Sequence, residues 1–235
     1  MLDTALILCG GHGSRLRPHT LNTPKPMVLC NEKPFLYFVL CQLAGQGIKK
    51  FILTTGYLGS KITEYFGDGS EWGWDIIYSQ GDENWMTGRR FWEARRHLPE
   101  VFLIAYADNF TEFSLLHSFR AFNNSVDITF LAVPNMFGEY TNRGNIRLLG
   151  DDTLVEYDKE STDSAYEFVE IGYLIARRYP LMLALKDKDC DFSVLLRKTS
   201  LEKRANAVIS NKPYIWITDE KSWKNAEKHL KKMKF

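Results

Sequence analysis

The chain has 235 residues, of which 45% are hydrophobic and 14% are aromatic. This length and composition exclude a mainly disordered chain and favour one domain, residues 1–235, with a sizeable core. The 30 Lys and Arg residues against 29 Asp and Glu residues leave a formal net charge of +1. The sequence therefore predicts no nucleic-acid partner and no membrane partner, and any anionic ligand should be small and bound locally.

The start of the chain has no basic segment, and its apolar run is too short for a signal peptide or a membrane span. We therefore expect a cytoplasmic protein. The four cysteines form no CxxC pair. This spacing favours reduced, mostly buried thiols over a disulfide scaffold.

In the first 133 residues, short β-branched and aromatic runs alternate with amphipathic segments, and Gly, Pro, Asn or Asp marks each change. This alternation predicts an α/β fold with a doubly wound sheet. The expected strands are Ala5–Cys9, Lys50–Thr55, Asp75–Ser79, Val101–Ala107 and Asp127–Val133. The expected helices are Pro34–Leu43, Ser60–Phe66, Arg89–His97 and Leu115–Phe122.

The pattern changes in the second half. Asn145–Leu149 and Thr153–Asp158 flank a Gly-Asp-Asp turn at 150–152, which predicts a β-hairpin inserted over one rim of the sheet. Phe168–Ala176 predicts another buried strand. The basic tail Lys221–Phe235 has apolar residues at helical spacing, which favours a covering helix with solvated lysines over a nucleic-acid patch.

The strongest local pattern is the loop Gly10–Arg15, which directly follows the first expected strand. It begins a G-x-G, but Leu16 stands where a dinucleotide fingerprint needs its third glycine, and no G-K-[ST] follows. Glycines let backbone N–H groups approach a ligand closely, and Arg15 and Arg17 add donors that suit phosphate oxygens. The loop therefore indicates a small phosphate-bearing ligand at the carboxyl end of the sheet.

Two further residues could bind that ligand. Lys25 lies between Pro24 and Pro26, which restrict the backbone on both sides and hold the ammonium group in place. A rigid turn with a solvated lysine is the alternative. Asp108 ends a strongly apolar expected strand, where a carboxylate is either functional or the cap of a turn or helix.

The run from Leu6 to Met27 resembles the signature of the sugar-phosphate nucleotidyltransferases, a pattern close to G-G-x-G-[ST]-R-L-x-P followed by P-K-P-M. The resemblance covers nearly the whole chain, clearly to Asn109 and more faintly after it. Other segments similar to the family in order and spacing are Lys33–Leu36, Gly47–Ile48, Gly56–Tyr57 and Ile62–Gly69.

The resemblance implies a Rossmann-like mixed sheet with helices on both faces, of the nucleotide-diphospho-sugar transferase type. Residues 1–110 would bind the nucleotide, and residues 111–235 would bind the acceptor. Some family members carry a C-terminal β-helix domain, for which this chain has no room. The sequence leaves the oligomeric state open, and a homo-oligomer is compatible with it.

The activity that the resemblance implies is transfer of a nucleoside monophosphate from an NTP, CTP or GTP, to a sugar 1-phosphate, with release of pyrophosphate. The sugar would be of the glucose, mannose or heptose type. The implied catalytic residues are Arg15, Lys25 and Asp108. The implied nucleotide-binding residues are Leu8, Gly10, Gly11, Gly13, Ser14, Arg15, Gln80, Thr87, Gly88 and Asp108.

The segment Trp85–Arg90 lies where the family recognises the nucleobase. Its Met-Thr-Gly run resembles the glucose-1-phosphate cytidylyltransferase version more than the thymidylyl version, which is a hint of CTP. Arg89 and Arg90 fit equally well with the solvated first turn of a helix.

The cofactor that the resemblance implies is Mg²⁺, bound by Asp108 in an element where Ala107 and Asn109 replace the family's glycines. The resemblance implies Asp219 as the second metal-binding carboxylate, a match that requires its loop to shift, with a cap of the last helix as the alternative. The five His residues include no HExxH motif or close cluster, so the sequence predicts no zinc site.

The prediction of acceptor-binding residues depends on the segment Val155–Lys159, which resembles the family's V-x-x-F-x-E-K. This implies that Lys159 binds the acceptor phosphate, with a surface lysine at the end of a hairpin as the alternative. Gly144, Glu170 and Gly172 lie where relatives contact the acceptor. Glu170 has the chemistry to accept hydrogen bonds from sugar hydroxyls.

The sequence holds no recognisable nucleophile motif. None is needed, because the acceptor phosphate brings an ionised oxygen. Two alternatives stay open: a cytidylyltransferase for a non-sugar phosphate such as phosphocholine, and a non-catalytic nucleotide-sugar-binding protein. A dinucleotide-dependent oxidoreductase is disfavoured, since no acidic residue ends the expected strand Lys50–Thr55.

Overall fold

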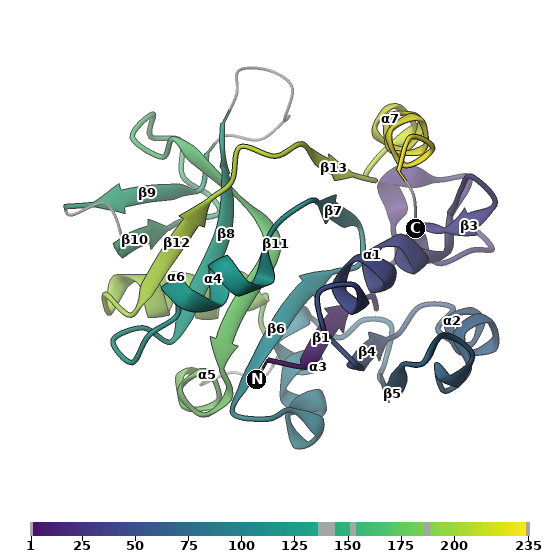
Figure 1. Cartoon of the computed structure of the whole chain (residues 1–235), viewed down its shortest axis with the longest axis horizontal. Helices are drawn as coiled ribbons and strands as arrows, with labels where there is room; N and C mark the ends of the chain where they lie inside the picture. The colour runs from purple at the N-terminus through teal and green to yellow at the C-terminus, as the bar shows by residue number, and fades with distance from the viewer. Residues whose placement is uncertain (1, 136–143, 151–153, 186–188, 234–235) are drawn as a thin grey trace.

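The structure, a computed structural model, describes residues 2–135, 144–150, 154–185 and 189–233. Within these residues, nine strands form one sheet in the order β5-β4-β1-β6-β11-β8-β12-β10-β9 (Figure 1). The strands of this sheet are β1 (Thr4–Leu8), β4 (Lys50–Thr55), β5 (Asp75–Gln80), β6 (Val101–Tyr106), β8 (Ile128–Pro134), β9 (Ile146–Leu149), β10 (Leu154–Tyr157), β11 (Phe168–Arg177) and β12 (Ala205–Ile209).

The sheet is mixed. The neighbours β5, β4, β1 and β6 run parallel, so their carboxyl ends meet at one edge. β11 runs antiparallel to both of its neighbours, β6 and β8, and β12 is parallel to β8. The doubly wound mixed sheet that the sequence and the resemblance indicated is therefore confirmed.

The predicted hairpin is present as the antiparallel pair β9 and β10. It does more than cover a rim, because β10 also pairs with β12 and β9 pairs with β11. The hairpin therefore extends the main sheet at one edge. The Asp-Asp part of its expected turn, at 151 and 152, lies outside the described residues, and Gly150 before it has a φ of 59°.

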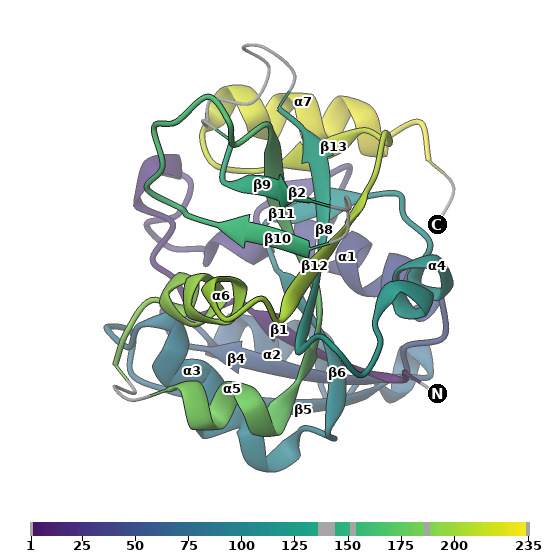
Figure 2. The ribbon, with the colours of Figure 1, turned by 90° about the vertical axis from the view of Figure 1, so that its left-hand side faces the viewer.

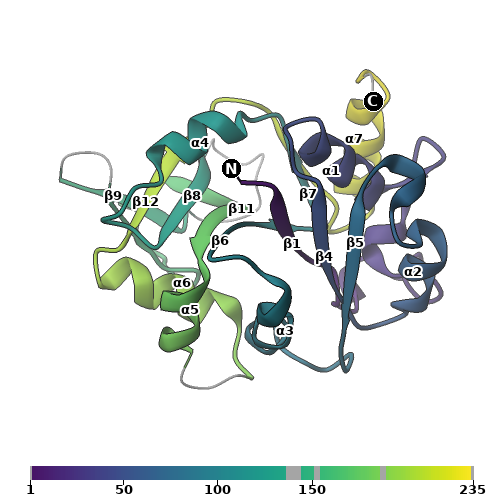
Figure 3. The same ribbon diagram turned by 60° about the horizontal axis from the view of Figure 1, so that its bottom comes forward.

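Helices cover both faces of the sheet (Figure 2 and Figure 3). Along β1, successive side chains point to opposite faces: Ile7 packs into the core under α1, α2 and α7, and Leu6 packs into the core under α3, α5 and α6. The helices are α1 (Phe35–Ala44), α2 (Ser60–Phe66), α3 (Thr87–Ala94), α4 (Leu115–Ala121), α5 (Arg178–Ala184), α6 (Phe192–Leu201) and α7 (Glu220–Leu230). Short 3-10 turns are η1 (Ser14–Leu16), η2 (Lys25–Met27), η3 (Ser70–Trp72) and η4 (Arg95–His97).

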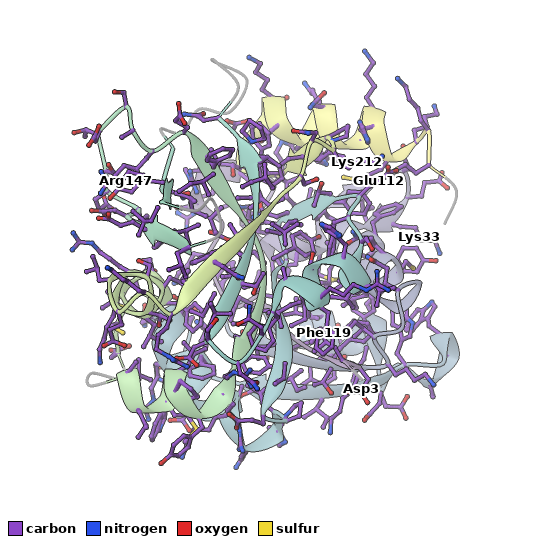
Figure 4. All side chains as sticks on the ribbon, turned by 60° about the vertical axis from the view of Figure 1, so that its left-hand side comes forward. Asp3, Lys33, Glu112, Phe119, Arg147 and Lys212 are labelled. Carbon is purple, nitrogen blue, oxygen red and sulfur yellow. The ribbon has the colours of Figure 1, made fainter. Side chains whose placement is uncertain are left out.

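Two small sheets complete the architecture. One pairs β2 (Leu29–Cys30) with β3 (Lys33–Pro34), and the other pairs β7 (Asn109–Thr111) with β13 (Tyr214–Trp216). The second pairing matters for the site, because it brings the segment after β13 beside the end of β6: the Ile217 N–H donates to the Asp108 carbonyl at 3.0 Å. Figure 4 shows Glu112, after β7, and Lys212, before β13, close together at the flank of this small sheet.

The elements differ from the expectations in three places. The helix expected over Arg89–His97 begins two residues earlier, at Thr87, and changes to the 3-10 turn η4 after Ala94. The last helix spans Glu220–Leu230, so it begins one residue before the basic tail Lys221–Phe235 and includes only the first ten residues of that tail. The sequence analysis predicted no element between residues 177 and 220, where α5, α6, β12 and β13 lie.

No helix in the described part of the chain combines the length and the apolar character that crossing a membrane requires. No disulfide links the cysteines, all of which are described. Cys9 and Cys30 are buried as expected, whereas Cys41 and Cys190 are only half-buried.

Candidate functional site

A cavity of about 430 Å³ opens at the carboxyl ends of β1 and β6. This is the edge at which parallel α/β sheets bind ligands. The cavity gathers residues from the glycine loop, from η2, from the start of α3 and from the loops before α6 and α7. The predicted site residues that line it are Leu8, Gly10, Gly11, Gly13, Ser14, Arg15, Lys25, Thr87, Asp108 and Lys159.

Glycine is suited to each position of the loop for a different structural reason. Gly11 is exposed, and a Cβ there would meet no atom within 4 Å, so its backbone is open to a ligand. Gly13 has a φ of 62° and lies so close to η2 that a Cβ would be 2.8 Å from the Lys25 Cβ. The Thr20 hydroxyl also donates to the Gly13 carbonyl at 2.9 Å. The loop is therefore folded back against Lys25.

Lys25 and Asp108 form an ion pair across the cavity. Lys25 is in η2, held between buried prolines, and Asp108 follows β6. The lysine side chain is 12% exposed and the aspartate side chain 32% exposed, so the pair faces the cavity rather than the bulk solvent. The Lys25 side chain is therefore held in position at the cavity, as the two prolines predicted, and it is not a solvated surface residue.

The surroundings of Asp108 fit a divalent cation held mainly by a substrate. Among the described residues, no group of three or more His, Cys, Asp or Glu side chains lies together as a metal cage. Mg²⁺ in phosphate-transfer sites is commonly bound by one or two carboxylates plus substrate phosphates and water. A half-exposed carboxylate beside a cavity with Arg15 and Lys25 in its wall provides that kind of donor set.

Asp219 has a structural role. It is the N-cap of α7, where its carboxylate accepts from the Ser222 N–H at 2.8 Å, and the Ser222 hydroxyl accepts from the Asp219 N–H at 3.0 Å. Hydrogen bonds from the Ser222 N–H and hydroxyl lower the pKa of Asp219. Its neighbour Thr218 lines the cavity, whereas Asp219 does not. The helix-cap interpretation is confirmed, and the second-metal-ligand role stays a prediction.

The expected nucleobase segment is tied to the residues before α6. The Thr87 hydroxyl accepts from the Phe192 N–H at 2.7 Å, and the Gly88 N–H donates to the Cys190 carbonyl at 2.8 Å. Gly88 is buried and does not line the cavity; a Cβ there would lie 2.7 Å from that carbonyl. Gln80, the last residue of β5, is exposed and also outside the lining. Contacts of Gly88 and Gln80 with a nucleotide therefore remain predictions.

The two arginines of this segment lie in different environments. Arg89 pairs with Glu93 at 2.8 Å on the half-exposed side of α3. Arg90 is only 4% exposed, and it lines the cavity. For Arg90 the expectation of a solvated first turn is wrong, because backbone carbonyls surround its guanidinium group.

On the acceptor side, Lys159 pairs with Asp191 at 2.8 Å, and both line the cavity. Asp191 is the N-cap of α6 and accepts from the Ser193 N–H at 2.9 Å. Although burial opposes the effect, hydrogen bonds from Lys159 and Ser193 lower the pKa of Asp191. Lys159 is therefore exposed toward the cavity and not only at the end of a hairpin.

The remaining acceptor candidates lie behind the cavity lining. Glu170 is 9% exposed, and it accepts from the Gly172 N–H. The pKa of Glu170 is raised to about 7, mainly by burial; the Gly172 N–H and Lys159 act in the opposite direction, and the charge of Asp108 acts in the same direction as burial. Gly172 has a φ of 79°, and a Cβ on it would lie 2.6 Å from the Asn109 Nδ2. A Cβ on Gly144 would lie 1.6 Å from the Tyr166 carbonyl oxygen, so both glycines are required by packing.

Sequence reasoning missed several lining residues, above all Asp191, Tyr106 and Thr218. Asp191 had a local signal: an Asp directly before the run Phe192–Leu201, whose apolar residues recur at helical spacing, is a typical N-cap. Tyr106 and Thr218 had none, because they face the cavity only through the pairing of β6 with β1 and of β13 with β7.

Comparisons with known proteins agree with this geometry. A family model described as Nucleotidyl transferase matches residues 4–162. A D-glycero-alpha-D-manno-heptose 1-phosphate guanylyltransferase of Campylobacter jejuni is 31% identical over 214 residues, covering 91% of this chain and 93% of the relative. The Bacillus subtilis protein named "Probable glucose-1-phosphate cytidylyltransferase" is 31% identical over 135 residues, covering 48% of this chain. The match spans 53% of that relative, about half its length.

The fold has close counterparts among solved structures. The crystal structure of HddC from Yersinia pseudotuberculosis superposes with a TM-score of 0.81 at 20% identity, covering 97% of this chain and 100% of that chain. At that identity, the likeness supports the fold alone. The family match covers well over half of the chain, including the glycine loop, Lys25, Asp108 and Lys159. The chain belongs to the nucleotidyl transferase family.

Proposed function

We propose that the protein transfers a nucleoside monophosphate from an NTP to a sugar 1-phosphate and releases pyrophosphate. The observation that carries this proposal is that two separate sets of cationic side chains line one cavity. Arg15 and Lys25 lie at the glycine loop, and Lys159 reaches the cavity from the segment after β10. Two phosphates of like charge can approach each other only where such cations offset their repulsion.

In the proposed reaction an ionised oxygen of the acceptor phosphate attacks the α-phosphorus of the NTP. The new O–P bond forms as the bond to the leaving pyrophosphate breaks, and no proton has to be removed from the nucleophile. Arg15 and Lys25 stabilise the negative charge on the triphosphate and on the departing pyrophosphate. Lys159 holds the acceptor phosphate in line. This division assigns nucleotide binding to residues 1–110 and acceptor binding to residues 111–235.

Enzymes of this family generally use a divalent metal ion. We propose Mg²⁺, held by Asp108 together with phosphate oxygens. When bound, it supplies charge neutralisation of the phosphates. Because Lys25 pairs with Asp108, the proposed metal-binding carboxylate and the proposed phosphate-binding ammonium group are in direct contact.

For the nucleotide we propose GTP, and for the acceptor a heptose or mannose 1-phosphate. The supporting comparison is the Campylobacter guanylyltransferase, which matches 91% of this chain, whereas the Bacillus cytidylyltransferase relative matches 48%. The Met-Thr-Gly run at residues 86–88 favours CTP and makes it the second candidate. A homo-oligomer remains a prediction that size-exclusion chromatography with light scattering would test.

A matrix of nucleotides and acceptors tests the proposal. Each of GTP, CTP, UTP and dTTP is combined with heptose, mannose and glucose 1-phosphates and with phosphocholine, and pyrophosphate release is measured with Mg²⁺ present. We expect the fastest release with GTP and a heptose or mannose 1-phosphate. Release only with CTP and phosphocholine would favour the non-sugar alternative. Nucleotide binding without release in any combination would favour a non-catalytic binding protein.

A further inference from the structure

Arg90 links the carboxyl ends of three neighbouring strands. Its guanidinium group donates to the Gly10 carbonyl after β1 and to the Thr55 carbonyl at the end of β4, both at 3.0 Å. It also donates to the carbonyls of Asp82 and Glu83 after β5, at 3.0 and 3.2 Å. One side chain from α3 therefore binds backbone oxygens of three strand ends, and these strands lie side by side in the sheet (Figure 3).

The Arg90 guanidinium group lies where the regular pairing of these three strands ends. The pairing of β1 with β4 ends at Leu8 and Thr54, and the pairing of β4 with β5 ends at Thr55 and Gln80. Just beyond these residues the Tyr57 N–H still donates to the Gly10 carbonyl at 3.4 Å and the Gly81 N–H to the Thr55 carbonyl at 3.1 Å, so Arg90 adds a side-chain donor to each of these two carbonyls. A planar fork with five N–H donors can hold several carbonyls at fixed directions, which a single ammonium group cannot do.

Two glycines make room for this arrangement. A Cβ on Gly10 would lie 2.3 Å from the Arg90 Cζ, and a Cβ on Gly56 would lie 2.7 Å from its Nη atoms. Gly10 is not among the glycines with positive φ. The side chain of Arg90, and not the backbone conformation, is therefore what excludes a larger residue at position 10. The first glycine of the phosphate-binding loop is therefore needed to leave space for the arginine side chain.

The charge of Arg90 is buried without a carboxylate partner. Among the described residues, none of the ion pairs includes Arg90, although it lines the cavity. Burial lowers the pKa of its guanidinium group. A buried cation whose direct partners are carbonyl oxygens, with the charge of Asp82 acting on it without an ion pair, favours an anion in the adjoining cavity.

We propose that Arg90 is a positioning residue for the nucleotide: it fixes the start of the Gly10–Arg15 loop against the ends of β4 and β5, and its loss weakens nucleotide binding without weakening acceptor binding. The inference rests on the proposed nucleotidyl transfer. Arg90 acts through backbone carbonyls, so it differs from Arg15 and Lys25, which face the phosphates directly.

A double-mutant cycle tests the inference. The variants are Arg90→Ala, Gly10→Ala and the double variant, and Arg96→Gln is the matched control because Arg96 is an exposed arginine beyond the end of α3. We expect each single variant to raise the KM for the NTP on the order of tenfold or more and to change the acceptor KM less than about twofold. The second substitution should add little to the first, because Gly10→Ala harms only by colliding with the guanidinium group.

Two further measurements separate positioning from general stability. Methylguanidine at millimolar concentration should lower the NTP KM of Arg90→Ala toward the wild-type value and should not affect Gly10→Ala. Arg90→Lys keeps the charge but not the fork, so it should also raise the NTP KM, and it replaces Arg90→Ala if that variant does not fold by circular dichroism. The inference is overturned if the effects of Gly10→Ala and Arg90→Ala multiply, or if the acceptor KM rises as much as the NTP KM.

Failure of the inference can be told apart from failure of the proposed function. If the wild-type protein releases no pyrophosphate in the full matrix, the proposed function fails. Arg90 is then tested by calorimetric titration with Mg²⁺ and GTP alone, where weaker binding by Arg90→Ala and by Gly10→Ala supports positioning and unchanged binding refutes it.

Discussion

At the scale of single residues, the ion pair between Lys25 and Asp108 brings together two residues on which the proposed chemistry depends. It joins the phosphate-binding loop region to the end of β6, which lie 83 residues apart in the sequence. Both partners were candidates from sequence, because two prolines restrict Lys25 and an apolar strand ends at Asp108. Their contact was not predictable, since it depends on the pairing of β1 with β6.

Asp108→Asn tests the carboxylate. If Asp108 holds the metal ion, the substitution should lower kcat on the order of a hundredfold or more, by analogy with the loss of one electrostatic stabiliser. Steady-state pyrophosphate release measures this. Asp75→Asn is the control, because Asp75 is exposed at the opposite end of the parallel strands. A near-normal kcat in Asp108→Asn would contradict the assigned role.

Lys159→Ala tests the acceptor side. The loss of this ammonium group should raise the acceptor KM and leave the NTP KM nearly unchanged, because the proposed function assigns Lys159 to the acceptor phosphate, and Arg15 and Lys25 to the nucleotide. Initial rates with each substrate varied in turn separate the two constants. Lys212→Ala is a matched control at an exposed lysine before β13 that does not line the cavity. An unchanged acceptor KM in Lys159→Ala would remove this residue from the acceptor site.

Glu170 makes stability depend on pH. Burial raises its pKa to about 7 in the folded protein, above the value of about 4.3 in an unfolded chain. The folded state therefore binds more protons than the unfolded state in this interval. Its stability is complete below the unfolded pKa and falls as the pH rises through about 7.

Glu170→Gln removes this titration. At pH 8 the variant should have a higher free energy of unfolding than the wild type, by on the order of 2–3 kcal/mol, and the difference should shrink toward pH 5. Urea unfolding at several pH values measures it. A difference of the same size at every pH would show that ionisation of Glu170 is not the cause.

At the scale of elements, local patterns predicted those strands and helices that alternate along the chain and bury one face. They did not predict β12, α5 or β13. β13 has three residues, and its partner β7 lies about 100 residues earlier, so nothing local marks it. The burial of Arg90 was also unpredictable, because its partners are backbone carbonyls that no side-chain pattern reveals.

Two substitutions of Asp219, the N-cap of α7, distinguish a helix-capping role from a metal-binding role. Asp219→Ala should destabilise the protein by about 1 kcal/mol, since it removes the capping carboxylate at Ser222. Asp219→Asn keeps a good cap and removes the charge. If Asp219 is only a cap, Asp219→Asn has normal stability and a normal kcat. Normal stability with a kcat that falls as far as in Asp108→Asn would identify Asp219 as the second metal ligand.

At the scale of the whole molecule, the fold brings two sets of cationic side chains to one cavity, Arg15 and Lys25 near the glycine loop and Lys159 after β10. β1 and β4 carry the glycine loop and its support, and the hairpin edge carries the acceptor lysine. The family resemblance predicted these cationic residues. The ion pair of Lys159 with Asp191 was not predictable, although a local N-cap signal marks Asp191 itself. Attack of an acceptor phosphate oxygen on the phosphorus of the transferred nucleoside monophosphate is the central claim.

An acceptor with ¹⁸O in its phosphate group tests that claim most directly. The protein is incubated with Mg²⁺, the NTP that gives the fastest pyrophosphate release and the labelled sugar 1-phosphate, and the products are analysed by mass spectrometry. Direct attack by the acceptor phosphate predicts a nucleotide sugar that retains all of the ¹⁸O and a pyrophosphate that contains none. Label in the pyrophosphate, or pyrophosphate release without a labelled nucleotide sugar, would contradict the account.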